Sequence, residues 1–333
     1  MKLTKIIRSK RRLWAIPVAI IILPVFVVFI VGQFTPVLST WIFKQAIDSY
    51  QFAQPENFAT IEANLISKTN LVYDEQGTLL DLYYPKERNA PLPVIVWIHG
   101  GGFIGGSKEL SRAYAMTMAN QGYLVANINY DLAPGHKYPR PVVQANQALQ
   151  YLREHAGEYG GDVDRLFLIS NSAGTQITSQ LAAITSNPEF AQEMGILPSV
   201  TSDQLRGVIL YDGGYDMRTI RATHAPLIVT ELWAYTGVRP FEDYARIDEL
   251  STVLHVTPDY PPVFLAVGGS DPLESQSLEF QEVLRKNQVE VEAFLYTGTG
   301  AHLGHDFMMD LDTQPAQQTL QQALDFLARH QRP

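Results

Sequence analysis

Cysteine is absent from the 333-residue chain. A chain without cysteine has no disulfide bond, no thiolate metal site and no cysteine nucleophile. The sequence also lacks the H-E-x-x-H spacing of zinc hydrolases and the G-K-[ST] ending of a phosphate-binding loop. It has no internal repeat and no low-complexity run. These absences exclude thiol chemistry and leave no sequence signature for a metal.

Acidic residues are missing from the start of the chain, where no Asp or Glu precedes Asp48. Six of the 25 basic residues precede Leu13, and the rest of the chain carries 19 basic and 34 acidic residues, a formal charge of −15. A nucleic-acid partner requires a basic face. The acidic body therefore argues against nucleic-acid binding.

One apolar run, LWAIPVAIIILPVFVVFIV at 13–31, has 19 residues and no charge. About 20 apolar residues in a helix span the ~30 Å hydrocarbon layer of a bilayer. Basic residues ahead of such a span favour a cytoplasmic amino terminus. We therefore predict a cytoplasmic segment at 1–12, a single-pass anchor at 13–33, and an extracytoplasmic remainder of the chain at the cell membrane.

Two alternatives compete with an anchor in this region. A cleaved signal peptide has a shorter apolar core and a small-residue cleavage site, and no A-x-A-like site follows this run. A buried core helix is the other alternative. Whether the segment is cleaved stays open at the level of the sequence.

Short apolar runs alternate with helical patterns from Leu71 onward. The runs are 93–99, 123–130, 165–170, 207–212, 262–268 and 291–298, after an expected hairpin at 71–85 with its turn at Gln76-Gly77. Strands alternating with helices predict an α/β fold with a mostly parallel central sheet and helices on both faces. We expect a stalk or docking element at 34–65 and a catalytic domain at 66–333. Lid-like insertions are expected at about 185–206 and 217–259.

The segment Ser170-Asn171-Ser172-Ala173-Gly174 lies between the strand-like RLFLIS and the helical TQITSQLAAI. A serine hydroxyl becomes a useful nucleophile when it is exposed and paired with a base, and a sharp strand-to-helix turn provides that exposure. The pattern resembles G-x-S-x-G with serine in place of the first glycine. Ser172 is therefore the candidate nucleophile.

Three glycines follow the apolar strand in His99-Gly100-Gly101-Gly102-Phe103. Glycines leave the backbone N–H groups of a turn open to a developing oxyanion, where the loss of one donor costs ~3 kcal/mol in other serine hydrolases. An ordinary glycine-rich turn is the structural alternative.

These motifs together resemble those of the hormone-sensitive-lipase-like branch of the α/β-hydrolases. They are HGGGF at 99–103, NYDLAPGHKYP at 129–139, DRLFLISNSAG at 164–174 and GGSDPL at 268–273. The resemblance covers roughly Leu71 to the carboxyl terminus. It implies the α/β-hydrolase fold, a Ser–Asp–His triad and an oxyanion hole formed by the N–H groups of Gly101, Gly102 and Ala173.

The chain departs from that family at four positions. Ser170 and Thr175 replace glycines, and Asp131 and Gly135 stand where the family usually has Arg and Glu. None of these positions carries a proton in the mechanism, so the departures bear on substrate range more than on chemistry.

Asp271, which follows the apolar run PVFLAVG, matches the family's orienting acid. An acid in this place holds the tautomer of the catalytic imidazole and stabilises its cation. An Asp-Pro turn is the structural alternative, and Asp212 and Asp216, after an earlier strand, are reserve candidates.

Two histidines compete for the role of base in the loop TGAHLGHDFMMD. The distance from Asp271 favours His302, whereas the pattern His-Asp-Phe, which resembles the family's His-x-Phe, favours His305. A few inserted residues in a loop cost little, while the neighbours of the imidazole set its aim. We therefore predict His305 as the base, with His302 as the alternative.

These residues predict a serine hydrolase that cleaves carboxylic esters through an acyl-enzyme, with no cofactor and no metal. An amidase or peptidase would use the same triad. A membrane-anchored binding protein on a hydrolase scaffold is the alternative from another class. The partners expected are a small-molecule or lipid ester and, through the amino-terminal segment, the membrane.

Overall fold

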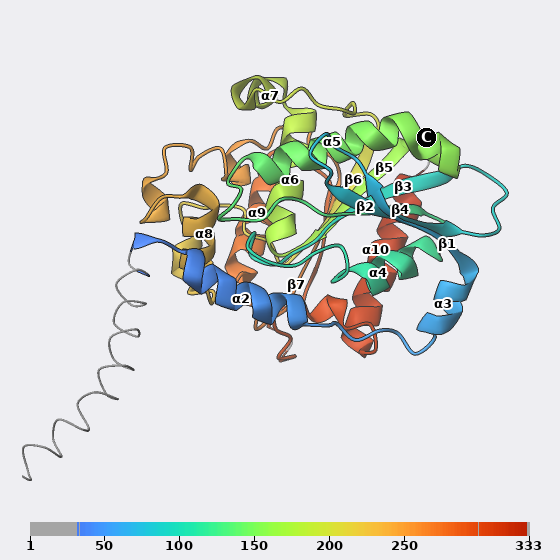
Figure 1. Cartoon of the computed structure of the whole chain (residues 1–333), viewed down its shortest axis with the longest axis horizontal. Helices are drawn as coiled ribbons and strands as arrows, with labels where there is room; N and C mark the ends of the chain where they lie inside the picture. The colour runs from blue at the N-terminus through green and yellow to red at the C-terminus, as the bar shows by residue number, and fades with distance from the viewer. Residues whose placement is uncertain (1–31, 33, 299, 332–333) are drawn as a thin grey trace, which may run out of the picture.

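The computed structural model describes residues 32, 34–298 and 300–331 of the chain (Figure 1). Within this part of the chain, no helix has both the length and the apolar character required to cross a bilayer. Of the anchor predicted at 13–33, only Gly32 lies among the described residues.

The described residues form one eight-stranded sheet in the order β1-β2-β4-β3-β5-β6-β7-β8. The strands are β1 (Leu65–Val72), β2 (Leu79–Pro85), β3 (Leu92–Ile98), β4 (Leu124–Ile128), β5 (Gly161–Asn171), β6 (Leu205–Tyr211), β7 (Val263–Val267) and β8 (Val291–Leu295). β1 and β2 pair antiparallel, as do β2 and β4, and the other strands pair parallel. Each apolar run predicted as a strand lies in this sheet.

Helices cover both faces of the sheet (Figure 1). They are α2 (Val37–Ser49), α3 (Phe58–Asn64), α4 (Arg112–Ala119), α5 (Arg140–His155), α6 (Ala173–Ser186), α7 (Pro188–Met194), α8 (Ile228–Thr236), α9 (Glu274–Lys286) and α10 (Gln314–His330). Short 3₁₀ turns are η1 (Ala156–Tyr159), η2 (Ile220–Thr223), η3 (Phe241–Asp243), η4 (Thr252–Leu254) and η5 (Phe307–Met309). Side chains of α5, α6 and α9 share one apolar cluster with the sheet, and those of α3, α4 and α10 share the other.

The central strands are buried because helices cover them on both sides. All seven residues of β3 are buried, and so are all five of β4 and of β7. Continuous apolar runs of this kind are typical of parallel strands in α/β proteins. The predicted hairpin is formed by β1 and β2, and its turn contains Gly77 at φ +84°.

Residues 34–65, expected as a stalk or a docking element, pack against the body of the protein. Thr40 is buried in α2, and Ile47 packs against the main apolar cluster. Asp48 Oδ1 accepts a hydrogen bond of 2.9 Å from the N–H of Gly106, in the loop after β3. α2 thereby lies beside α8 at one edge of the molecule (Figure 1).

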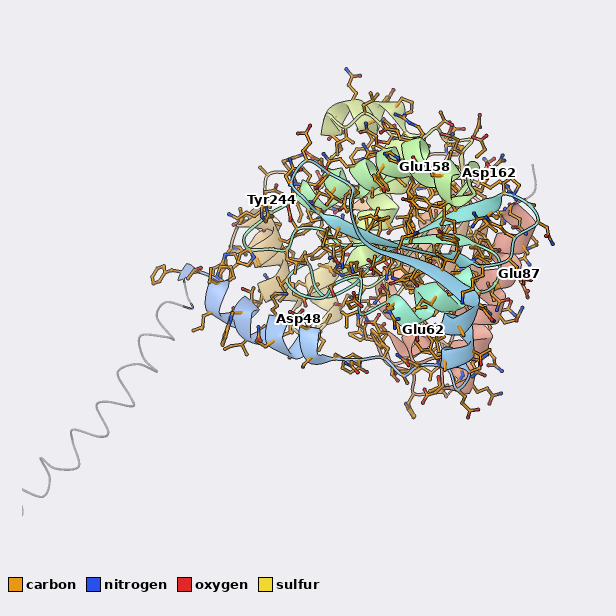
Figure 2. All side chains as sticks on the ribbon, turned by 45° about the vertical axis from the view of Figure 1, so that its right-hand side comes forward. Asp48, Glu62, Glu87, Glu158, Asp162 and Tyr244 are labelled. Carbon is orange, nitrogen blue, oxygen red and sulfur yellow. The ribbon has the colours of Figure 1, made fainter. Side chains whose placement is uncertain are left out.

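The acidic excess lies on the surface of the body. Figure 2 shows Asp48, Glu62, Glu87 and Glu158 on four separate elements around the ribbon, and all four are exposed. Dispersed acidic side chains keep a protein soluble and repel polyanions.

A buried ion pair ties the loop after β3 to the sheet. Lys108 Nζ donates to Asp81 Oδ2 over 2.9 Å, and these residues are only 5% and 1% exposed. The same carboxylate accepts hydrogen bonds from the Tyr83 hydroxyl and from the N–H of Asn70. The loop begins with the glycine turn at 100–102 and reaches Lys108 near its other end. The ion pair therefore fixes the end of the loop that is farther from the glycine turn.

We expect Lys108→Met to lower the free energy of unfolding by about 3–5 kcal/mol, because Asp81 would keep a buried charge without its counter-ion. The measurement is chemical denaturation followed by circular dichroism. The double variant Asp81→Asn, Lys108→Met removes both charges and should recover part of the loss. A loss under about 1 kcal/mol for Lys108→Met would contradict a structural role for this pair.

Candidate active site

A cavity of about 590 Å³ opens at the carboxyl ends of the parallel strands. Its floor comes from the turns after β3 and β5 and from the loops after β7 and β8. Its wall comes from α8, the segment before α8, and α2. Ligands of open α/β sheets bind at this edge. Most of the lining side chains are apolar, and the polar ones gather at the floor.

A sharp turn presents Ser172 to this cavity. β5 ends at Asn171 and α6 begins at Ala173, and Ser172 between them has φ +52° and ψ −123°. A strained strand-to-helix turn of this kind is the geometry described for the nucleophile elbow of hydrolases. A β-carbon on Gly174 would lie 2.2 Å from the carbonyl oxygen of Ile98, so the turn requires glycine there.

Ser170 and Thr175, which stand where the family has glycines, contact each other. Thr175 Oγ1 donates to the carbonyl oxygen of Tyr211 over 2.8 Å, which uses its only proton. The Ser170 hydroxyl therefore donates to Thr175 Oγ1 over 3.1 Å. Both residues are fully buried. The two side chains thus fill space that glycines would leave empty, and the hydroxyl groups hydrogen-bond to each other.

His305, Ser172 and Asp271 form one hydrogen-bonded chain. His305 Nε2 lies 2.8 Å from Ser172 Oγ, and its Nδ1 lies 2.8 Å from Asp271 Oδ2. The other oxygen of Asp271 accepts the N–H of Leu273 over 2.7 Å. These are hydrogen-bond distances suited to a nucleophile, a base and an orienting acid. His302 is exposed and does not line the cavity.

The buried Asp212 lies beside this chain. Burial raises the pKa of Asp212 well above its usual range, and the nearby charge of Asp271 raises it further. Burial alone would raise the pKa of Asp271 as well, but its hydrogen bonds with His305 and Leu273 and the charge of His305 outweigh it and lower that pKa. The pKa values of the two adjacent carboxyl groups are thus shifted in opposite directions, because two adjacent carboxylates do not both ionise easily.

The neighbouring carboxylates also act on the base. Burial alone would lower the pKa of His305, but Asp306 and Asp271 outweigh it and raise that pKa above the ordinary value. An imidazolium formed on His305 is therefore well stabilised.

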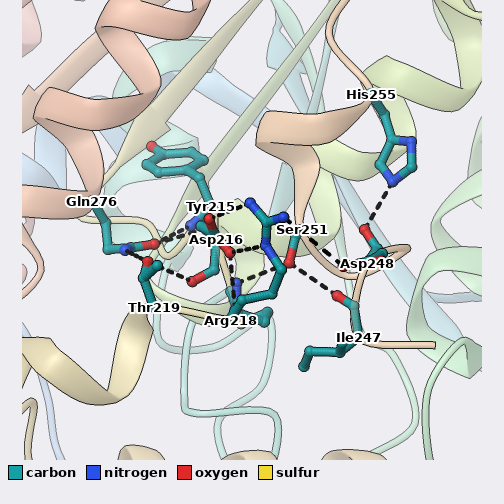
Figure 3. A network of polar contacts seen from close by, with 10 residues as sticks. Tyr215, Asp216, Arg218, Thr219, Ile247, Asp248, Ser251, His255 and Gln276 are labelled. Atoms are coloured by element: carbon teal, nitrogen blue, oxygen red, sulfur yellow. Dashed lines mark hydrogen bonds and ion pairs between the residues drawn. The ribbon is translucent and has the colours of Figure 1, made fainter. Parts of the chain in front are cut away.

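The second reserve acid, Asp216, pairs with Arg218 and not with His305. Its two carboxylate oxygens accept hydrogen bonds of 2.7 and 2.8 Å from the guanidinium of Arg218 (Figure 3). Gln276 Oε1 accepts the N–H groups of Tyr215 and Asp216 in the same network. Asp216 thus fixes the start of the segment that leads to α8, and it makes no contact with the base.

The predicted oxyanion donors line the cavity together. Gly101 has φ +116° and Gly102 φ +61°, and Ala173, as the first residue of α6, has no intrahelical acceptor for its N–H. Asn171 joins this turn to the loop of the base: its Oδ1 accepts the N–H of Gly100, and its Nδ2 donates to Asp306.

Only one of the two expected lid segments reaches the cavity. The segment at 217–259 supplies Ile228, Glu231 and Leu232 to the lining, whereas no residue of 185–206 is among the lining residues. α7, in that first segment, packs instead on α6. α2 supplies the wall that the sequence did not indicate, through Ala46, Ile47 and the following Tyr50.

Two groups of described side chains have the composition of a cation site. Asp212, Asp271 and His305 have ligand atoms within 4.8 Å of one another, as do the surface residues Glu290, Glu292 and His330. In the first group both ring nitrogens of His305 bond to Ser172 and Asp271, so a metal would have to break that chain. The arrangement fits proton transfer rather than metal coordination.

Gly101→Ala tests the packing of the glycine turn. A β-carbon there would lie 2.2 Å from the Gly105 carbonyl oxygen, whereas at Gly122, with φ +100°, it would meet nothing within 4 Å. We expect Gly122→Ala to cost about 1–2 kcal/mol of unfolding free energy from its left-handed backbone alone. Gly101→Ala should cost a further 1–3 kcal/mol or so from overpacking. Equal losses in denaturant titrations would contradict a close-packed turn.

Comparison with known proteins places the chain in a family. Residues 80–284 match the family model BD-FAE, a range that includes Ser172 and Asp271 and ends before His305. Among curated relatives, the chain is 27% identical over 243 residues to the probable isoprenylcysteine alpha-carbonyl methylesterase ICMEL1 of Arabidopsis thaliana. It is 27% identical over 250 residues to esterase LipC of Mycobacterium tuberculosis. These alignments cover 69% and 73% of this chain but 50% and 60% of those proteins, so the chain spans little more than half of their length.

Solved structures show the same architecture over most of the chain. Esterase B from Lactobacillus rhamnosis superposes with a TM-score of 0.75 and 25% identity, covering 88% of this chain and 92% of that one. A bacterial heroin esterase superposes with a TM-score of 0.65 and 23% identity, covering 83% and 90%. With the family model matched over residues 80–284, the chain belongs to the BD-FAE family and has the α/β-hydrolase fold.

Proposed function

We propose that this protein is a serine carboxylesterase. The observation that carries the proposal is the hydrogen-bonded chain from Ser172 through His305 to Asp271 at the floor of an apolar cavity. Both ring nitrogens of the histidine are engaged at 2.8 Å, as acyl transfer by a serine requires. The relatives are named esterases, and one solved neighbour is described as inhibited by a tributyrin phosphonate.

The first half of the reaction forms an acyl-enzyme. Ser172 Oγ attacks the ester carbonyl carbon while His305 Nε2 takes its proton, and Asp271 stabilises the imidazolium. The carbonyl oxygen becomes an oxyanion, toward which Gly101, Gly102 and Ala173 donate their N–H groups. The intermediate then collapses, and the alcohol leaves with the proton held by His305.

Water completes the cycle. It attacks the acyl group on Ser172 while His305 takes a proton from it, and the carboxylic acid leaves as Ser172 recovers its hydrogen. His305 can take the proton from Ser172 and from water because its Nε2 faces the serine hydroxyl while Asp271 holds the other ring nitrogen. No observation favours an amidase or a non-catalytic binding protein over an esterase.

We also propose that residues 13–33 anchor the protein in the cell membrane, with the catalytic domain outside the cytoplasm. The uncharged run at 13–31 and the basic residues before it support this topology. Phe34 and the first two turns of α2 support it too, because Phe34 and, in α2, Val37, Trp41 and Ile42 are 52–81% exposed. Exposed apolar side chains with a tryptophan suit the headgroup region of a bilayer.

The triad assignment is tested by three alanine variants on a short-chain p-nitrophenyl ester. Ser172→Ala and His305→Ala should each lower kcat on the order of 10⁶-fold, because members of a triad act as a unit. His302→Ala is the matched control and should keep most of the activity. A fluorophosphonate should label the wild type stoichiometrically and leave Ser172→Ala unlabelled. Loss with His302→Ala and retention with His305→Ala would move the base to His302.

The topology is tested by adding a protease to intact cells that express the protein, or to their spheroplasts. The catalytic domain should be digested without lysis, because the basic segment at 1–12 holds the amino terminus inside. A cytoplasmic marker protein in the same cells is the control and should survive until lysis. Protection of the catalytic domain until lysis would overturn the proposed orientation.

A further inference from the structure

Glu231 brings a carboxyl group to the floor of the cavity. It lies in the first turn of α8 and lines the same cavity as Ser172 and His305. Its carboxyl rests on Gly102: a β-carbon built on that glycine would lie 2.2 Å from Glu231 Oε1 and 2.5 Å from its carboxyl carbon. The carboxyl therefore lies beside the proposed oxyanion donors.

This carboxyl has no partner among the described residues of the chain, in which no hydrogen bond or ion pair to its oxygens occurs. The other carboxyl in the lining, Asp306, accepts a hydrogen bond of 2.9 Å from Asn171. No Lys or Arg occurs among the described residues that line the cavity. Apart from an imidazolium on His305, which the catalytic steps use, a cation near Glu231 would thus have to come from the ligand.

An unpaired carboxyl in an apolar cavity is costly to maintain, since an ionised group loses its hydration there. Burial raises the pKa of Glu231 to about 7, although the positive charge of His305 acts in the opposite direction. A small number of placed polar groups in an apolar cavity sets the orientation and specificity of ligands. The catalytic steps have no use for Glu231, which is therefore free to contact the substrate.

We propose that Glu231 forms a subsite for a positively charged group of the substrate, so that the preferred esters carry an amine or quaternary ammonium close to the scissile carbonyl. This inference rests on the proposed esterase function and names its substrate class. The closeness of Glu231 to Gly102 limits the reach, because the cation must lie within a few bonds of the ester carbon. Esters with an anionic group near the carbonyl are poor substrates for the same reason, since Glu231 and Asp306 repel them.

The experiment compares two pairs of esters. In each pair, one member contains a quaternary nitrogen and the other has a carbon atom in its place. On the alcohol side the pair is acetylcholine and 3,3-dimethylbutyl acetate. On the acyl side it is the p-nitrophenyl esters of 4-(trimethylammonio)butanoate and 5,5-dimethylhexanoate. The readout is the ratio of kcat/KM, cationic over neutral, within each pair. This ratio cancels any change in the catalytic groups that affects both members equally.

The full-length wild type should favour the cationic member about tenfold or more in at least one pair, which corresponds to ~1.4 kcal/mol of differential binding. Glu231→Gln keeps the shape of the side chain without its charge and should bring that ratio close to one. Glu282→Gln, at an exposed position of α9, is the matched control and should keep the wild-type ratio.

The ratio should also depend on pH. Glu231 gains its charge as the pH rises through its pKa, so the wild-type preference for the cation should grow between about pH 6 and pH 8. The other titratable groups of the lining are His305, Asp306 and Tyr50. His305 and Asp306 remain in the Glu231→Gln variant, whose ratio should stay flat, and this isolates the contribution of Glu231.

Two failures are distinguishable. If the wild type hydrolyses none of the four esters and resists a fluorophosphonate, the esterase function itself is wrong. If it hydrolyses them with equal kcat/KM within each pair, or if Glu231→Gln keeps the wild-type ratio, the subsite is wrong and the esterase function stands.

Discussion

The site depends on one strained turn at the end of the central strand. Ser172 can hold φ +52° only because its surroundings fix the chain on both sides: its N–H donates to the carbonyl oxygen of Tyr211, and Gly174 passes against the backbone of Ile98. The first contact joins the turn to β6 and the second joins it to β3. The strain is thus distributed over three neighbouring strands of a close-packed sheet, which is how a folded protein sustains an unfavourable backbone.

Near that turn, burial and hydrogen bonds shift the pKa values of two neighbouring carboxyl groups, Asp271 and Asp212, in opposite directions. Asp271 accepts hydrogen bonds from His305 and from the N–H of Leu273, which hold its pKa below the usual range, whereas burial raises the pKa of the neighbouring Asp212. The N–H of Asp306 donates to Asp212 Oδ2 over 2.7 Å, so the loop of the base is tied to the same pair. Two aspartates thus differ in pKa because their surroundings differ, as is common among neighbouring carboxyl groups in active sites.

Much of this could be predicted from the sequence, because its signals were local. Continuous apolar runs identified the parallel strands, and the position of Ser172 between a strand and a helix identified the elbow. The choice of His305 over His302 rested on the adjacent Phe307. That ring is buried and packs edge-to-face on Tyr296, 5.1 Å between centroids, which directs the preceding histidine inward.

The residues that the sequence did not reveal depend on contacts between distant segments. The apolar residues of α2 contain no sign that they line the same cavity as Ser172. Glu231 looked like any charged residue in a helical turn, and only its position over Gly102 separates it from a surface carboxylate. The raised pKa of Asp212 follows from its burial beside Asp271, which no pattern along the chain encodes.

The hydroxyl pair under the elbow has a consequence for how such a sequence can diverge. Thr175 bonds to the Tyr211 carbonyl whether or not Ser170 is present, but the buried hydroxyl of Ser170 has Thr175 as its acceptor. Starting from glycine at both positions, threonine at 175 can arise first without leaving an unsatisfied hydroxyl, whereas serine at 170 cannot. The two substitutions therefore form an ordered, epistatic step, and a lineage that carries Ser170 should already carry a hydroxyl at 175.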